Sequence, residues 1–216
     1  MARGIENDGR RFLRYNSLQV TAFTPSTIAA LIIAASFAAG FNVYATVLTL
    51  GLLAHTHWVV LPQGLEILGN RAIIAVSGVL FAMEFVADKI PGFDMLWNAL
   101  HTFIRVPVAA LLAYRASAHL SPEMQLLATV GGGAIALVAH SSKTAVRAVI
   151  TPSPEPVSNI ALSTGEDGIA IGLTWLATQH PWTAAGIAIA LTLITILMMR
   201  WVVKALRRTW GRLQTI

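Results

Sequence analysis

The sequence contains no cysteine and few charged residues. The absence of cysteine excludes disulfide bonds, thiolate metal sites and a cysteine nucleophile. Lys, Arg, Asp and Glu together make up only 12% of the 216 residues, whereas a soluble globular domain carries about 25%. So few charged side chains could not cover a globule of this size. The composition therefore argues against a soluble enzyme, a disordered chain and a coiled coil.

Apolar residues, in contrast, are abundant. They account for 56% of the chain, and the mean hydropathy is +0.67. A helix needs about 20 apolar residues to cross about 30 Å of hydrocarbon. Windows of that length predict six spans, at about residues 27–54, 72–87, 97–118, 124–150, 159–178 and 182–203. We therefore expect an all-α, polytopic protein whose main partner is the lipid bilayer.

The basic residues predict the orientation of the chain. Six spans place both termini on one side, and that side receives twelve of the fifteen Lys and Arg residues, against two on the other side. By the positive-inside rule, both termini should be cytoplasmic. Nine of the fifteen lie before the first span or at and beyond the end of the last. We interpret these tails as topology signals that contact anionic lipid, and no nucleic-acid partner is predicted.

The order of features indicates an internal repeat. Between the basic tails, 1–24 and 207–216, the chain divides into halves at 25–120 and 121–206. Each half has a helix rich in small residues, then an acidic span, then a span that opens with tryptophan. Three spans per half force opposite orientations, so we expect two three-helix inverted repeats, an architecture typical of transporters. The small-residue faces would permit a homodimer.

Breaks interrupt both halves at membrane depth. The segment 88–94 contains Pro-Gly, which should end a helix, and Asp94 is predicted to cap the next one. The proline-rich segment 151–156 should not be helical, so Ser163 or Thr164 is predicted to cap a short helix. At 1.5 Å per residue that helix would cover about 21 Å. We therefore expect broken or re-entrant segments, which point to a transport site.

Charged and polar residues recur at helical spacing within the spans. Such residues are costly in a membrane and are functional by default. The predicted substrate- or ion-binding residues are Glu84, Asp88, Lys89, Asp94, His101, Arg105, Lys143, Arg147, Asn159, Ser163, Glu166 and Asp167. We expect Arg105 and Arg147 to pair with the acidic residues across the repeat interface. No metal site and no cofactor are predicted.

A simpler interpretation stays open for each candidate. Those near helix ends, such as Lys89 and Asp94, could lie at the headgroup level as caps or extended basic side chains. Those deeper in the spans, such as Glu84 and Arg105, could form structural ion pairs without any ligand.

The sequence also resembles a known family. The string Glu-Phe-Val-Ala-Asp-Lys-Ile-Pro-Gly-Phe-Asp at 84–94, followed by Trp97, His101 and Arg105, resembles the hallmark of a bacterial membrane family catalogued as domain of unknown function 4126. The second half is similar to that family through Lys143, Arg147, Asn159, Ser163, Glu166 and Asp167. The resemblance covers about residues 29–196.

One departure from the family pattern falls at 40–42, where Gly-Phe-Asn stands in place of the Gly-Leu-Arg often seen in members. A basic residue is therefore absent from the first helix. The resemblance implies a multi-pass protein of the bacterial cytoplasmic membrane, and it supports the choice of site residues. It implies no activity.

Three functions remain open. A small secondary transporter or channel for an ion or a small polar or anionic solute fits the predicted breaks, repeats and buried charges. A structural or partner-binding membrane subunit would use the same ion pairs only to hold its fold. An intramembrane enzyme acting on lipid headgroups could use His101 and His140 as acid and base, but no catalytic or metal motif accompanies them.

Overall fold

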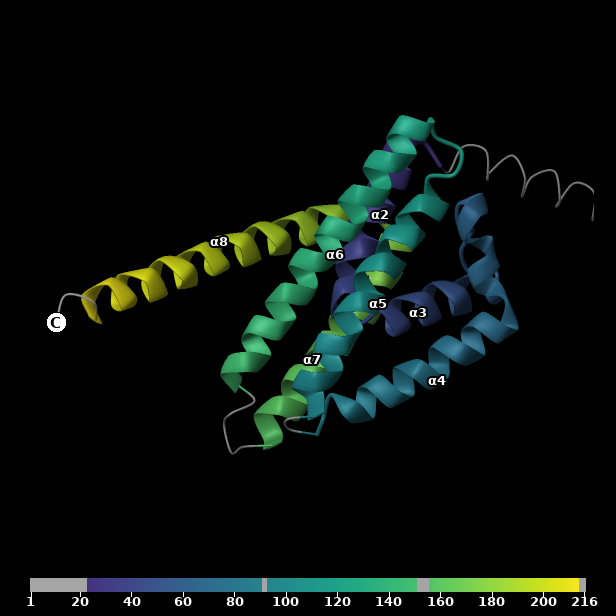
Figure 1. Ribbon diagram of the computed structural model, residues 1–216. Coiled ribbons are helices and arrows are strands. Elements are labelled where there is room, and N and C mark those ends of the chain that lie inside the picture. The colour runs from purple at the N-terminus through teal and green to yellow at the C-terminus, as the bar shows by residue number, and fades with distance from the viewer. Residues whose placement is uncertain (1–22, 91–92, 151–155, 214–216) are drawn as a thin grey trace, which may run out of the picture.

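The computed structural model describes residues 23–90, 93–150 and 156–213, which form helices and no strands. The elements are α2 (Pro25–Phe41), α3 (Val43–His55), the short 3-10 helix η1 (Gln63–Gly69), α4 (Arg71–Ala87), α5 (Phe93–Ala116), α6 (Pro122–Ile150), α7 (Pro156–Gln179) and α8 (Pro181–Leu213). Figure 1 shows their arrangement. The predicted all-α class is confirmed. The segment 1–22 and the Pro91-Gly92 break lie outside the described residues.

Several helices are long and apolar enough to cross a membrane. Within the described ranges these are Leu96–Ala116, Pro122–Arg147 and Pro181–Trp201, and η1 with α4 would make a fourth span that bends by 69°. The apolar helices α2 and α3 are shorter, with 17 and 13 residues. Six spans and an inverted repeat stay predictions.

The first predicted span, 27–54, is wrong as a single helix. It breaks at Asn42, whose backbone is extended at φ −149° and ψ 103°. The Asn42 N–H donates to the Ala38 carbonyl at the end of α2. Its side-chain oxygen accepts from the Ala45 N–H at 2.9 Å and so caps α3. One asparagine thus ends one helix and starts the next.

The predicted short helix after the proline-rich segment is also wrong. α7 begins at Pro156 and runs for 24 residues, since proline is well suited to the first turn of a helix. Ser163 and Thr164 lie two turns inside it, and the Thr164 hydroxyl donates to the Ile160 carbonyl, as in a helix interior. Neither residue caps α7.

Two further boundaries differ from the prediction. α5 begins at Phe93, one residue before Asp94, so Asp94 is not its N-cap. α8 continues to Leu213, well past the predicted end at residue 203, and Figure 1 shows its C-terminal part extending away from the other helices. The basic residues near its end do not stop the helix, because Lys and Arg are good helix formers.

The helix α2 forms the centre of the bundle. It packs against α5, α6, α7 and α8, and eleven of its residues are buried. Small side chains permit this close contact. A Cβ atom added to Gly40 would lie 2.5 Å from the Ala136 carbonyl oxygen on α6, so the two backbones touch there.

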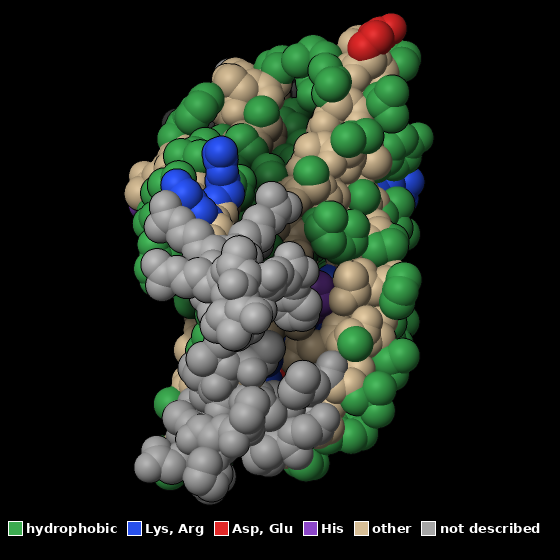
Figure 2. Space-filling model, turned by 60° about the vertical axis from the view of Figure 1, so that its left-hand side comes forward, with side chains coloured by type: hydrophobic (Ala, Val, Ile, Leu, Met, Phe, Trp, Pro, Cys, Tyr) green, Lys and Arg blue, Asp and Glu red, His purple; other side chains and the backbone are tan. Residues whose placement is uncertain are grey.

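On the face seen in Figure 2, the described side chains are largely hydrophobic and are drawn in green. Large apolar residues stand almost fully exposed on α5, α6 and α8, including Phe103 at 82%, Leu127 at 72% and Trp201 at 72%. Seven charged side chains at the junction of α4, α5, α6 and α7 are buried instead, whereas Arg71, Arg115 and Glu123, near helix ends, are exposed. This is the reverse of a water-soluble protein and matches a hydrocarbon surround.

Candidate functional site: a buried network of charged side chains

Seven ionisable side chains gather where α4, α5, α6 and α7 meet. Each exposes at most 4% of its surface. They are Glu84 and Asp88 at the end of α4, Arg105 on α5, Lys143 and Arg147 on α6, and Glu166 and Asp167 on α7. We call these seven residues the charge network. All seven are among the predicted site residues, and the fold brings them together from both halves of the sequence.

Arg105 links α5 to α4 and α6. Its guanidinium forms an ion pair with Glu84. Its Nη1 atom donates to the Asn98 oxygen and to His140 Nδ1, both at 2.9 Å. Because a guanidinium can only donate, His140 Nδ1 accepts. The imidazole is therefore neutral, and its Nε2–H donates to the Thr102 hydroxyl at 2.6 Å.

Lys143 lies at the centre of the charge network. Its Nζ atom is 2.8 Å from Asp88 Oδ2, 3.3 Å from Glu166 Oε2 and 3.6 Å from Glu84 Oε1. It also donates to the carbonyl of Phe41 at 3.1 Å. Phe41 is the last residue of α2, where carbonyl groups lack partners within the helix. One ammonium group thus serves three carboxylates and a helix terminus.

Arg147 joins the end of α4 to α7. Its guanidinium forms an ion pair with Glu166, and its Nη2 atom lies 3.1 Å from Asp88 Oδ2. Its Nη1 atom donates to the Asp88 backbone carbonyl at 3.2 Å. Burial by itself would raise the pKa of Asp88, which follows the last residue of α4. The charges of Lys143 and Arg147 outweigh burial and hold that pKa below its usual value.

Asp167 differs from the other three acids. Its Oδ1 atom accepts from the Asn42 amide at 2.8 Å. The Asn42 side chain therefore caps α3 and contacts α7 at once. Asn42 was absent from the predicted site. A polar amide inside an apolar run without charge was the signal that could have found it.

Four buried polar atoms have no hydrogen-bond partner among the residues that the structure describes. They are Glu84 Oε2, Trp97 Nε1, Arg105 Nε and Asp167 Oδ2. Unsatisfied buried groups are costly and rare, so their concentration around the charge network supports this region as the candidate site. Within the same ranges, no three His, Asp or Glu side chains are grouped as a metal site would need.

His101 lies beside the charge network and is not a member of it. Its ring stacks on Trp97 with centroids 4.3 Å apart, and it meets Tyr44 edge-on at 5.7 Å. Its Nδ1 atom bonds the Trp97 carbonyl at 2.8 Å. These contacts make His101 part of an aromatic group on the α3 side of the site.

Lys89 lies two residues beyond the end of α4, is half-buried and turns back onto that helix. Its Nζ atom lies 3.0 Å from the centre of the Phe85 ring and donates to the Phe85 carbonyl. A longer bond of 3.5 Å reaches Ser163 Oγ on α7. Burial lowers the pKa of Lys89, and Asp167 and Asp88 act against this effect.

Two predicted site residues are not placed. Asp94 lies on α5 and Asn159 on α7, but their side chains fall outside the described part of the structure.

A cavity of about 720 Å³ borders the charge network between α6, α7 and α8. Its walls are mostly apolar, with Ile169, Met198 and Met199 among them. Two members of the charge network, Lys143 and Glu166, also line it. The cavity therefore places an open space beside two of the buried charges.

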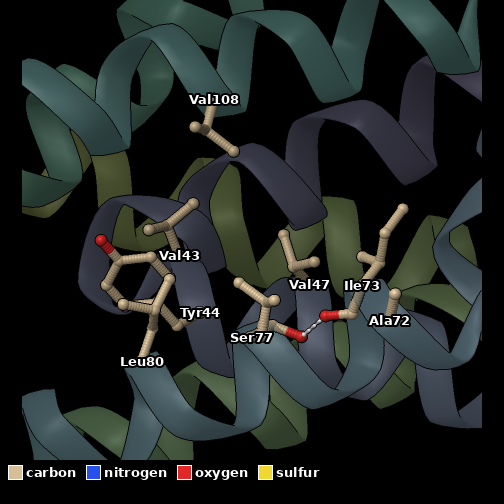
Figure 3. A pocket seen from close by; sticks show the side chains of 9 residues that line it. Val43, Tyr44, Val47, Ala72, Ile73, Ser77, Leu80 and Val108 are labelled. Atoms are coloured by element: carbon tan, nitrogen blue, oxygen red, sulfur yellow. Dashed lines mark hydrogen bonds between the residues drawn. The ribbon is translucent and has the colours of Figure 1, made fainter.

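A second cavity, of about 350 Å³, lies between α3, α4 and α5 and has a different character. Figure 3 shows its aliphatic walls and the Ser77 hydroxyl bonded to the Ile73 carbonyl. Because that hydroxyl already has a hydrogen-bond partner, the residues that line the cavity offer a solute no free polar group apart from the Tyr44 hydroxyl. The larger cavity is the better candidate for a binding site.

In the part of the chain that the structure describes, fold and site define an all-α protein with three or four helices apolar and long enough to cross a membrane and with a buried charge network. A family model described as Domain of unknown function (DUF4126) matches residues 29–201. The chain belongs to this family, as the motif at 84–94 led us to expect. No curated protein and no solved structure matches the chain.

Proposed function

We propose that the protein is a small secondary transporter or channel for an ion or a small polar or anionic solute. The observation that carries this proposal is the contact between the larger cavity and the charge network at Lys143 and Glu166. A purely structural ion pair has no need of an open space beside it. Charge held inside a membrane is expensive and usually marks a pathway.

The origin of the network residues supports a site between two repeats. α4 and α5 belong to the first half of the sequence, and α6 and α7 belong to the second. Each half therefore supplies two helices and both signs of charge, as expected for a site between inverted repeats. In this proposal both termini are cytoplasmic, as the distribution of Lys and Arg indicates.

The test uses the full chain in proteoliposomes on a solid-supported electrode. The probes are sodium, potassium, chloride, phosphate and acetate, each applied as a concentration jump. We expect at least one probe to give a saturable charge movement. In the double variant Lys143→Gln/Glu166→Gln this movement should fall about tenfold or more. Removing one charge of each sign leaves the net charge of the network unchanged and limits damage to the fold.

Ser77→Ala is the matched control, since Ser77 lines the apolar cavity and lies outside the charge network. It should transport like the wild type. Two results would contradict the proposal: no probe moves faster than in protein-free vesicles, or the double variant is as active as the wild type. The second result would favour a structural membrane subunit.

A further inference from the structure

The charge network is not electrically balanced. It contains four carboxylates, namely Glu84, Asp88, Glu166 and Asp167, and three cations, namely Arg105, Lys143 and Arg147. With every group ionised, one negative charge would remain buried without compensation. An isolated carboxylate in a low-dielectric interior is costly, and such a group takes up a proton instead.

The excess charge falls on one residue. Glu84, Asp88 and Glu166 each have an Arg or Lys nitrogen within 4 Å. For Asp167 the described residues provide an amide, Asn42, and no cation at that range. Its second oxygen has no hydrogen-bond partner among them.

Among the described residues, no cation of a neighbouring element forms an ion pair with Asp167. The charges that act on Asp167 are Lys143 of α6 and the acids Glu84 and Asp88 at the end of α4. Lys89, two residues beyond α4, also attracts Asp167, but it forms no ion pair with it. Lys143 is already shared by three other carboxylates. Glu166, the neighbour of Asp167 on α7, adds a further negative charge to the network.

The remaining elements packed on α7 carry no compensating charge. α2 has no charged residue, and the only ionisable groups of α3 are Tyr44 and His55. The stretch of α8 from Pro181 to Met199 is also uncharged. Lys89 is committed to the Phe85 ring and carbonyl and to Ser163.

We propose that Asp167 is protonated at neutral pH on Oδ2 and is the proton-exchanging group of the site. This rests on the proposed function in one respect, because exchange of the proton would couple a proton to solute movement. The Asn42 amide suits this role, since it donates to Oδ1 whether Oδ2 is protonated or not. One carboxylate beside one amide also offers too few oxygens for Ca²⁺ or Mg²⁺.

The first test compares Asp167→Asn with Glu166→Gln in the purified full chain, with thermal unfolding followed from about pH 4 to about pH 9. Asparagine imitates the protonated acid, so Asp167→Asn should unfold at the wild-type temperature or higher. Wild-type stability should fall as the pH rises and Asp167 loses its proton, and this fall should be absent in Asp167→Asn. Glu166→Gln should be less stable at every pH, because Arg147 and Lys143 both lose their ion pair with the Glu166 carboxylate.

Infrared spectroscopy gives a second readout that does not depend on transport. The wild type should show a carboxylic-acid carbonyl band that Asp167→Asn abolishes and Asp167→Glu shifts. The proposal is overturned if the band persists in Asp167→Asn. It is also overturned if Asp167→Asn is as destabilised as Glu166→Gln, which would mean an ionised and paired Asp167. If the band is assigned to Asp167 but no probe is transported, protonation stands and the proposed transport function fails.

Discussion

Arg105 and Glu84 form an ion pair that is fully buried, with both side chains at 0% exposure. At the scale of single residues, such a pair matters mainly through what happens when one partner is lost. Taking both charges out of water is expensive, and the pair roughly repays that cost. A single charge left in the interior without its partner has nothing to offset that cost. The pair therefore fixes the relative position of α4 and α5 without adding much net stability.

A double-mutant cycle on this pair checks that account. Arg105→Met should lower the free energy of unfolding by about 3–5 kcal/mol, because it leaves Glu84 buried beside a shared Lys143. Adding Glu84→Leu removes the stranded charge, so the double variant should lose at least about 2 kcal/mol less than the sum of the two single variants. Unfolding in detergent with added denaturant measures all three. Additive effects would show that the two side chains do not interact.

The types of residue in the site were predictable, but their partners were not. Residues three or four apart on a helix share a face, and this placed Glu84 with Asp88 and Lys143 with Arg147 correctly. Pairing depends on how helices lie in space. Arg105 pairs with Glu84 of its own half, whereas the sequence predicts a pair that crosses between the halves. Asp167 pairs with neither arginine.

At the scale of elements, the contact between α2 and α6 depends on the absence of side chains. A Cβ on Gly40 would lie 2.5 Å from the Ala136 carbonyl oxygen and 2.6 Å from the Ala139 Cβ atom. Backbone atoms of a packed helix cannot move aside easily. The central position of α2 therefore requires glycine at this point.

The pair Gly40→Ala and Gly131→Ala tests this contact with the same chemical change. Gly40→Ala should destabilise the fold by about 1–3 kcal/mol through overpacking. Gly131, on α6, has open space where a Cβ would be, so Gly131→Ala should be neutral or stabilising by up to about 1 kcal/mol through helix propensity. Thermal unfolding in detergent compares the two. Equal effects at both positions would contradict the close contact.

The ends of α4 and α6 were predictable to within a few residues, as was the break between α4 and α5, whereas the break at Asn42, the start of α7 and the end of α8 were not. The runs that became α4 and α6 have clear ends and no competing signal. The break at Asn42 was missed because hydropathy averages over one asparagine in a long apolar run. The start of α7 was misplaced because Ser163 and Thr164 resemble caps. Inside a helix the same hydroxyl bonds to its own chain, as Thr164 does to the Ile160 carbonyl.

At the scale of the whole molecule, the buried charged residues are concentrated in the charge network. Large apolar side chains are exposed on α4, α5, α6 and α8, as on the face seen in Figure 2, while the charge network occupies the junction of four helices. The cavity between α6, α7 and α8 reaches that network at Lys143 and Glu166. A transporter or channel requires water or solute to enter this cavity, whereas a structural subunit does not.

The lack of native cysteine allows the most direct measurement of this central claim. Single cysteines are placed at two positions on α6, and reaction with a charged, membrane-impermeant thiol reagent is followed in proteoliposomes. Ser142 lines the cavity next to Lys143, and Leu137 is an exposed apolar residue on the same helix. Because the thiolate is the reacting form, only a position that water reaches should react. We predict that Ser142→Cys is labelled and Leu137→Cys is not; an unreactive Ser142→Cys would contradict the proposed solute pathway.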